Sequence, residues 1–380
     1  MNIKSCLFYL GLSCFPISLM SLINIFYSFY FNYLDSVNSY LLVFILSLIF
    51  GLFLFQIGKK EKEIINIYEQ IFLIFLIYFL ISFLILIPIY SNNYGISFID
   101  AYFESISGLT GTGFSIVKNI KIFDEPLILW RSSSQWIGGF YFLIFLVLIF
   151  SNKQFNFKLT NLSFNFEKKI NFSPNLISVS NRIFFIYIFS SLIILATFLL
   201  SGMRIFDSLN LTMTVISSGG FIPTNSLDQI IINNTQEISL CFAFLVSILN
   251  FYLFYNLILA RENIKEHRED IYLLILIIFF SITFYLINDL NLSSVFVNVI
   301  SSIGTSGISI NSVPDNFGLY FIILTLFGGS VLSTTSGLKF LRIYILIKAF
   351  FLEINKLVKP NVVIDTKMMF SEKKINNENI

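Results

Sequence analysis

Long apolar segments alternate with shorter polar stretches along almost the whole chain. Eight apolar segments are visible, at residues 5–30, 38–57, 65–90, 126–150, 183–201, 237–260, 271–288 and 318–352. Because about 20 apolar residues in an α-helix cross the hydrocarbon core of a bilayer, segments of this length predict membrane-spanning helices. Their continuous runs of Phe, Ile and Leu differ from the alternating pattern of a β-barrel strand. The pattern therefore predicts an all-α integral membrane protein.

A shorter helical stretch lies between the third and fourth segments. It begins at Asp100, runs about ten residues without a helix breaker and ends in the Gly- and Thr-rich tip 110–113. A helix of about ten residues is about 15 Å long, which is roughly half the hydrocarbon thickness of a bilayer. A half-length helix that ends in glycines within a membrane protein predicts a re-entrant pore loop.

The same spacing occurs three times. A residue able to cap a helix N-terminus precedes a glycine by thirteen residues in the pairs Asp100 and Gly113, Asp207 and Gly220, and Ser294 and Gly307. A single glycine-rich turn would be an ordinary loop, but three at one offset, each between apolar segments, favour three pore loops. The expected fold is a two-helix hairpin followed by three helix–pore-loop–helix repeats around a pseudo-symmetric pore. The expected boundaries are 1–58 for the hairpin, 59–152, 168–262 and 263–358 for the repeats, and 359–380 for a cytoplasmic tail.

Composition and charge agree with a membrane protein. The chain is 56% hydrophobic and 12% charged, whereas soluble domains carry roughly 25% charged residues. Of the 24 Lys and Arg residues, 18 fall in connections on one side of the predicted membrane. By the positive-inside rule both termini are cytoplasmic, in a multi-pass protein with membrane lipid around it.

Residues that serve metal, redox or acid–base chemistry are scarce. Cys6, Cys14 and Cys241 fit no metal or disulfide spacing, and the single histidine, His267, lies in a charged loop. Glu104 is the one carboxylate inside a predicted pore helix after its first residue, and we expect it to be hydrogen-bonded rather than catalytic. The sequence therefore predicts no enzyme, no cofactor and no nucleic-acid partner.

Backbone carbonyls at the three tips are the expected ion ligands. A monovalent cation exchanges its water shell for rings of carbonyl oxygens, and glycine tolerates the backbone conformations that turn successive carbonyls inward. The pore helices also point their partially negative C-terminal ends at the tips. Because no tip carries a full charge, a divalent-cation site is disfavoured, while potassium and sodium both remain open. The candidate filter residues are Thr110, Gly111, Thr112, Gly113, Ser217, Ser218, Gly219, Gly220, Gly304, Thr305, Ser306 and Gly307.

The last apolar segment is expected to break in the membrane. As one helix, 318–352 would be roughly 50 Å long, and its middle is rich in Gly, Ser and Thr. A break there predicts a flexible flap below the filter, and the two cations that follow are candidates for influencing ion passage. The alternative is that both cations reach a membrane interface. The candidate gate residues are Gly328, Gly329, Ser330, Ser333, Thr334, Gly337, Lys339 and Arg342.

Five stretches together carry a family resemblance. They are 107–113 (Ser-Gly-Leu-Thr-Gly-Thr-Gly), 129–139 (Leu-Trp-Arg-Ser-Ser-Ser-Gln-Trp-Ile-Gly-Gly), 216–221, 328–339 and 359–364. They resemble, in this order, the first pore loop, the Trp-Arg-x-x-x-Gln-Trp-Ile-Gly-Gly signature, the second pore loop, the gating loop and the segment after it in the Trk/Ktr/HKT superfamily of potassium transporters. The similarity is greatest to the bacterial Trk-type pore subunit, and 129–139 is its most specific part.

The resemblance implies a function and partners. It implies potassium uptake, with K⁺ at the filter carbonyls, a homodimer, and a cytosolic nucleotide-binding regulatory subunit that docks on the basic loops. Two departures are visible: Thr335 and Ser336 stand where the family usually has glycines, and three pore-loop repeats stand where the family has four. We therefore expect a separate chain to supply the fourth repeat, or the sequence to be truncated. The main alternative is a non-conducting relic or assembly subunit, and a solute carrier or a membrane enzyme is a third possibility.

Overall fold

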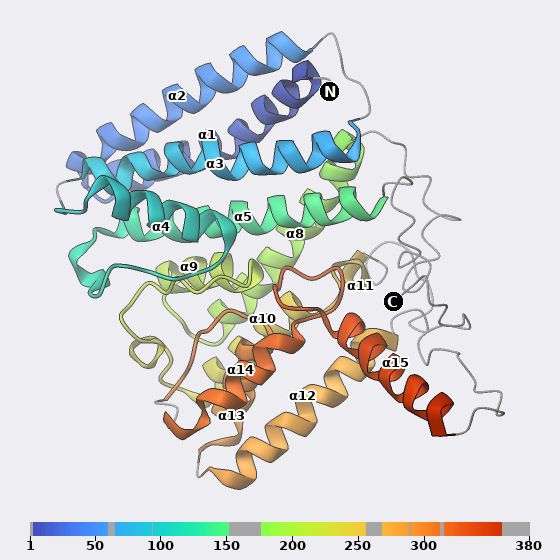
Figure 1. Cartoon of the computed structure of the whole chain (residues 1–380). Helices are drawn as coiled ribbons and strands as arrows, with labels where there is room; N and C mark the ends of the chain where they lie inside the picture. Colours follow the sequence, from blue (N-terminus) through green and yellow to red (C-terminus); the bar gives the residue numbers. More distant parts are fainter. Residues whose placement is uncertain are drawn as a thin grey trace.

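The computed structural model describes residues 3–59, 65–92, 94–151, 176–255, 268–288, 290–311 and 315–358. Within these ranges the regular elements are all helices (Figure 1). Six of the described helices are long and apolar enough to cross a bilayer: α1 (Ile3–Tyr30), α2 (Leu34–Gly58), α3 (Ile67–Ser91), α5 (Glu125–Ser151), α8 (Leu176–Leu200) and α12 (Arg268–Ile287). The predicted all-α, multi-pass membrane fold is confirmed. His267, the tail 359–380 and most of the basic connections lie outside the described residues.

Helices α1 and α2 form the predicted hairpin at one end of the molecule, beside α3 (Figure 1). Gly11, Gly51 and Gly58 allow the backbones of α1 and α2 to approach closely. A Cβ on Gly11 would lie 2.7 Å from the Phe55 nitrogen, and one on Gly58 would lie 2.4 Å from the Lys4 oxygen. Small residues at such crossings are typical of helix pairs in membranes, where close packing takes the place of the hydrophobic effect.

Three units of similar construction follow the hairpin. Each holds a spanning helix, a short helix of 12 or 13 residues, and a helical segment that returns. Unit 1 is α3, α4 (Phe98–Thr110) and α5. Unit 2 is α8, α9 (Ile205–Ile216), α10 (Asn234–Ile248) and α11 (Phe251–Tyr255). Unit 3 is α12, α13 (Leu292–Ile303), α14 (Gly318–Phe327) and α15 (Phe340–Val358), and the short 3₁₀ helices η1 (Ile120–Ile122), η2 (Leu227–Gln229) and η5 (Asp315–Phe317) lie in the connections.

The three short helices begin three residues earlier than predicted. Asp100, Asp207 and Ser294 were expected as N-caps, but the N-caps are Ser97, Arg204 and Asn291. In α4 the Ser97 hydroxyl oxygen accepts a hydrogen bond from the Asp100 N–H at 3.2 Å, which is the usual capping bond to the third residue. Asp100 and Asp207 therefore lie in the first turn, where a carboxylate is favoured by the positive end of the helix dipole.

Two of the long apolar segments are broken. The break in 318–352 was predicted, and α14 ends at Phe327 while α15 begins at Phe340. The break between α10 and α11 was not predicted, because 237–260 is apolar throughout. At this break the Asn250 N–H donates to the Asp270 carboxylate at 3.0 Å, and the Phe251 N–H donates to the Leu332 carbonyl at 2.8 Å. Partners from α12 and from the loop 328–339 thus replace the bonds of a continuous helix.

Candidate functional site: three loops that meet at their glycines

The three short helices end in loops that meet, although they are far apart in the sequence. We call residues 110–114 loop 1, 217–221 loop 2 and 304–308 loop 3. A Cβ on Gly113 would lie 2.4 Å from the Gly220 nitrogen, and a Cβ on Gly220 would lie 2.9 Å from the Ser306 oxygen. Loop 1 therefore touches loop 2, and loop 2 touches loop 3, each through a glycine that leaves no room for a side chain.

The three loops share one backbone turn. Gly111, Ser218 and Thr305 occupy equivalent positions and all have left-handed φ angles, of 70°, 54° and 57°. In each case the N–H donates to the carbonyl three residues earlier over 3.0 Å. Gly113 and Gly307 are also left-handed, as the glycine argument predicted, whereas Gly220 is not and is required by its close contacts.

A side-chain hydroxyl holds the outgoing end of every loop. The hydroxyls of Ser107, Thr214 and Ser301, at equivalent positions of the short helices, donate to the carbonyls of the residue seven positions later. The distances are 2.5 to 2.7 Å. This bond turns the carbonyl of the residue after Gly113, Gly220 or Gly307 back toward the short helix of the same unit. The sequence analysis missed it, although a hydroxyl residue six positions before each glycine was a visible signal.

Glu104 lies in a buried network at the end of loop 1. Its carboxylate is paired with Arg131 of α5, with the Arg131 Nε at 2.9 Å. It also accepts hydrogen bonds from the Ser115 hydroxyl at 2.9 Å and from the Ile116 N–H at 3.2 Å. The prediction that Glu104 is hydrogen-bonded is confirmed. Since the carboxylate is neutralised by an arginine, its role in this structure is to fix the chain after loop 1.

The equivalent positions in the other units follow the same logic. Asn298 in unit 3 accepts from the Ile310 N–H at 2.9 Å and donates to the Ile310 carbonyl at 3.0 Å. In unit 2 the equivalent of Glu104 is Leu211, and the equivalent of Ile116 is Pro223. Proline has no N–H to satisfy, so an apolar Leu211 leaves no donor without a partner.

The signature at 129–139 lies on α5 and holds loops 1 and 2 together. The Arg131 guanidinium lies over the Phe221 ring, 4.2 Å from its centroid. The Gln135 side-chain oxygen accepts from the Phe221 N–H at 3.3 Å. These two polar residues of unit 1 therefore position the end of loop 2.

The two glycines of the signature provide space. A Cβ on Gly138 would collide with the Leu109 carbonyl of α4. One on Gly139 would lie 2.7 Å from the Ser217 Cβ of loop 2. Helix α5 thus runs directly against the end of α4 and against loop 2, and the signature residues are packing and hydrogen-bonding elements between units 1 and 2.

The two ends of the loop series are open. The residue after the glycine is 2% exposed in loop 2 (Phe221) and 5% exposed in loop 3 (Ile308), but 71% exposed in loop 1 (Phe114). At the other end, a Cβ on Gly307 would meet nothing within 4 Å in the described part of the chain, whereas Gly113 and Gly220 each touch the next loop. Among the described residues the three loops therefore contact one another in series, with Phe114 of loop 1 exposed and the Gly307 side of loop 3 open.

The candidate gate is a compact loop at residues 328–339. The Lys339 ammonium group donates to the Ser333 carbonyl at 3.2 Å and to the hydroxyls of Ser333 and Thr335 at 3.0 and 3.2 Å. The Thr335 hydroxyl also accepts from the Gly329 N–H at 2.9 Å. Lys339 is buried and holds the loop from within, while Arg342 lies in the first turn of α15 with an exposed side chain.

Glycines and neighbouring elements fix the ends of this loop. Gly328 and Gly337 have positive φ angles of 62° and 83°. They lie at opposite ends of the loop, and a Cβ on either glycine would clash with the backbone near the other. The Ser330 N–H donates to the Ile248 carbonyl at the end of α10 over 3.0 Å. The Val331 N–H donates to the Glu269 carboxylate of α12 at 3.0 Å. The candidate gate residues are therefore brought together, with the exception of Arg342.

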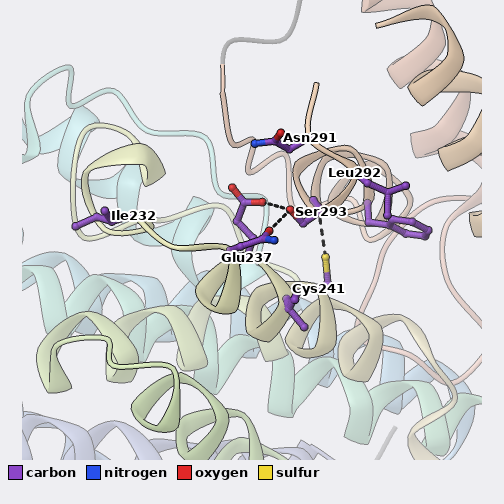
Figure 2. Close-up of a pocket in the computed structure, with 9 residues that line it drawn as sticks. Ile232, Glu237, Cys241, Asn291, Leu292 and Ser293 are labelled. Carbon is purple, nitrogen blue, oxygen red and sulfur yellow. Dashed lines mark hydrogen bonds between the residues drawn. The ribbon is translucent and has the colours of Figure 1, made fainter. Parts of the chain in front are cut away.

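A cavity of about 610 Å³ lies between the first turns of α10 and α13, and none of the candidate filter residues lines it. Figure 2 shows the Ser293 hydroxyl beside the Glu237 carboxylate, with the Cys241 thiol directed toward Ser293. The Ser293 hydroxyl also donates to the Asn234 side-chain oxygen at 2.5 Å, and the Cys241 thiol donates to the Ser293 carbonyl at 3.7 Å. These contacts join unit 2 to unit 3. Among the described residues no group of His, Cys, Asp and Glu could hold a metal ion.

Comparison with known proteins gives consistent relatives. No family model matches the chain. It is 27% identical over 357 residues to an uncharacterised cation transporter of Methanocaldococcus jannaschii, covering 90% of this chain and 72% of that protein. It is 24% identical over 331 residues to the Trk system potassium uptake protein TrkG of Escherichia coli, covering 82% and 67%. The crystal structure of the potassium transporter TrkH from Vibrio parahaemolyticus matches with a TM-score of 0.83 at 20% identity, over 98% of this chain and 80% of that one.

Proposed function

The chain is related in sequence and in fold to the Trk-type potassium transporters, and on this premise we propose that it serves potassium uptake through a filter of backbone carbonyls in loops 1, 2 and 3. The observation that carries the proposal is the meeting of three equivalent loops at Gly113 and Gly220. Its relatives are transporters, not enzymes, in agreement with the sequence analysis.

The chemistry of the loops suits a monovalent cation. Residues 110–114, 217–221 and 304–308 include no charged side chain, so the ligands available there are carbonyl and hydroxyl oxygens. Potassium filters replace the hydration shell of the ion with such oxygens. The partially negative C-terminal ends of α4, α9 and α13 lead into the loops and favour a cation without binding it as tightly as a carboxylate would. In this proposal the candidate filter residues bind K⁺ through their carbonyls.

The loop 328–339 is the proposed gate beneath the filter. It interrupts a helix of unit 3 at the depth of the loops, and irregular backbone at that depth is tolerated where it is buried or lines a wet path. Lys339 supports the gate by holding the loop in its folded form. Movement of the loop away from loops 2 and 3 would then open the path.

Completion of the ring is part of the proposal. Within the part of the chain that the structure describes, the exposed Phe114 and the open side of Gly307 leave both ends of the loop series without a neighbouring loop. We propose that a fourth helix–loop–helix unit, on a continuation of the chain or on a separate chain, fills this gap. A homodimer, a cytosolic nucleotide-binding regulatory subunit, and the bacterial inner membrane with both termini cytoplasmic are further parts of the proposal that rest on the family resemblance and the positive charges.

The test is uptake of potassium in a bacterial strain that lacks its own potassium uptake systems. The chain is expressed alone and together with a pore unit fused or co-expressed to fill the gap. We expect uptake with the fourth unit present, and a comparison of potassium with sodium reports the selectivity. Absence of uptake under both conditions, with the protein present in the membrane, would contradict the proposal and favour a non-conducting assembly subunit.

A further inference from the structure

The left-handed residues of loops 2 and 3 carry side chains that the backbone does not favour. Glycine is the residue that adopts left-handed φ without strain, and loop 1 has Gly111 at this position. Loops 2 and 3 have Ser218 and Thr305 instead. A β-branched residue such as threonine is rarely left-handed. The choice of hydroxyl residues here indicates that their side chains are needed.

Both hydroxyls contact the candidate gate. The Ser218 and Thr334 hydroxyl oxygens are 3.0 Å apart, and both residues are buried. Because the Thr334 hydroxyl donates its proton to the Ser247 carbonyl at 3.2 Å, Ser218 is the donor in this pair. One hydroxyl of loop 2 thus holds the middle of the loop 328–339 and, through Thr334, the end of α10.

The second contact has the same position in loop 3. The Thr305 hydroxyl oxygen accepts from the Ser336 N–H at 3.0 Å and from the Ser336 hydroxyl at 2.9 Å, and it donates to the Gly304 carbonyl at 2.7 Å. A hydroxyl has one proton and two acceptor sites, so Thr305 uses its full capacity. Ser336 is one of the two residues that stand where the family resemblance predicts glycine, and a glycine could make only the N–H bond.

We propose that Ser218 and Thr305 are a pair of hydroxyl latches that hold the loop 328–339 against loops 2 and 3, so that the loop must break both contacts before ions can pass. The inference rests on the proposed function, because it assigns these residues a role in controlling passage through the same pore. It assigns loop 1 no latch, since Gly111 has no side chain. Ser218 and Thr305 act through the gate and are positioning residues in this role.

Variants can remove each latch without disturbing the fold. Ser218→Gly and Thr305→Gly delete the hydroxyls and suit the left-handed backbone, so both are expected to fold. Thr334→Val removes the partner of Ser218 from the side of the gate. Thr305→Ser keeps the hydroxyl. Ser302→Ala is a matched control, because the Ser302 hydroxyl bonds only to the Asn298 carbonyl in its own helix, at 2.7 Å.

Two measurements on the full-length chain in lipid nanodiscs and in cells test the latches. Hydrogen–deuterium exchange of peptides covering 328–339 reports release of the loop, and potassium uptake reports passage. We expect Ser218→Gly to raise both rates about threefold to tenfold, the range for loss of one hydrogen bond, and Thr305→Gly, which removes two hydrogen bonds to Ser336, to raise them at least as much. Ser218→Gly combined with Thr334→Val should add little to Thr334→Val alone, since Thr334→Val already breaks the contact with Ser218 in addition to the bond to the Ser247 carbonyl. Ser302→Ala should match the wild type in both rates, and Thr305→Ser, which keeps the hydroxyl, should match it in hydrogen–deuterium exchange.

The outcomes separate the latches from the proposed function. Faster exchange in the glycine variants, together with no potassium uptake either with or without the fourth unit, would support the latch contacts and contradict the proposed function. If the wild type takes up potassium and the glycine variants change neither the exchange rate nor the uptake rate, the latches are overturned and the proposed function stands. Faster exchange without faster uptake, in a chain that does take up potassium, would overturn control of passage by these contacts.

Discussion

Phe114 and Phe221 are phenylalanines at equivalent positions of units 1 and 2, yet they have opposite environments. Phe221 is buried under Arg131 and beside Gly108 of unit 1, while Phe114 is largely exposed. The local sequence around them is similar, with a glycine before and a hydroxyl-held carbonyl at the phenylalanine itself. The difference lies in what covers each ring: Phe221 packs against residues of unit 1, whereas no described residue covers Phe114 in the same way.

Removal of the Arg131 side chain, which covers Phe221, should cause the largest loss of stability. Arg131→Ala leaves the Glu104 carboxylate buried without its partner and takes the guanidinium off Phe221. Breaking one side of a buried ion pair costs about 3–5 kcal/mol. We expect a strong loss of thermal stability in detergent, measured by the unfolding temperature. The double variant Arg131→Met with Glu104→Gln should recover part of it, and equal losses in the single and double variants would contradict the ion-pair account.

Truncation of the two phenylalanines tests the comparison directly. Phe221→Ala removes a buried ring and should lower the free energy of unfolding by about 3 kcal/mol. Phe114→Ala should change it by less than about 0.5 kcal/mol, because the ring contributes little burial in the isolated chain. Denaturant or thermal unfolding of both variants measures the difference. With a fourth unit bound, Phe114→Ala should instead weaken that association, and a stable Phe221→Ala protein would refute the assignment of Phe221 to the core.

Alanine variants of two glycines with similar φ angles, Gly113 and Gly307, test next whether loop 1 packs against loop 2. Gly113→Ala and Gly307→Ala share the cost of a left-handed alanine, but only the first places a methyl group against a neighbouring loop. Overpacking adds about 1–3 kcal/mol, so Gly113→Ala should be the more damaging variant by that amount. The measurement is the difference in stability and in potassium uptake between the two variants. Equal behaviour of both variants would show that loops 1 and 2 do not touch as described, and a Gly113→Ala without effect on uptake would favour the non-conducting alternative.

Among the variants at buried positions, loss of the hydroxyl that holds the end of loop 2 should give the smallest effect. Thr214→Val keeps the shape of the side chain but leaves the Phe221 carbonyl without its donor. Loss of one buried hydrogen bond costs about 1 kcal/mol. A small fall in unfolding temperature is expected, together with lower selectivity for potassium over sodium in competition uptake. Thr214→Ser is the control that retains the bond, and a Thr214→Val protein with wild-type selectivity would limit the role of the bond to stability.

The sequence predicted those features that depend on local properties. Apolar length located the spanning helices, and the thirteen-residue spacing located the three loops, because both are set by neighbouring residues. Features that depend on distant partners were missed. The break after Ile248 is fixed by Asp270 and by Leu332.

The candidate site was predicted in part for the same reason. Glycine content indicated where backbones turn, and Gly113 and Gly307 are left-handed as expected. It did not indicate that Ser218 and Thr305 adopt the same conformation, since their hydroxyls find acceptors and donors only when the loop 328–339 folds beside them. The ion-binding role of these residues and the topology in the membrane stay predictions.

The pairing of Leu211 with Pro223 has a consequence for how this sequence can vary. An N–H at position 223 would face an apolar side chain, and a polar side chain at position 211 would face a residue that offers no donor. Either change alone would bury a group without a partner, at a cost of about 1–3 kcal/mol. The two positions are therefore expected to change together during evolution. The pairs Glu104 with Ile116 and Asn298 with Ile310 show the other combinations that satisfy this pair of positions.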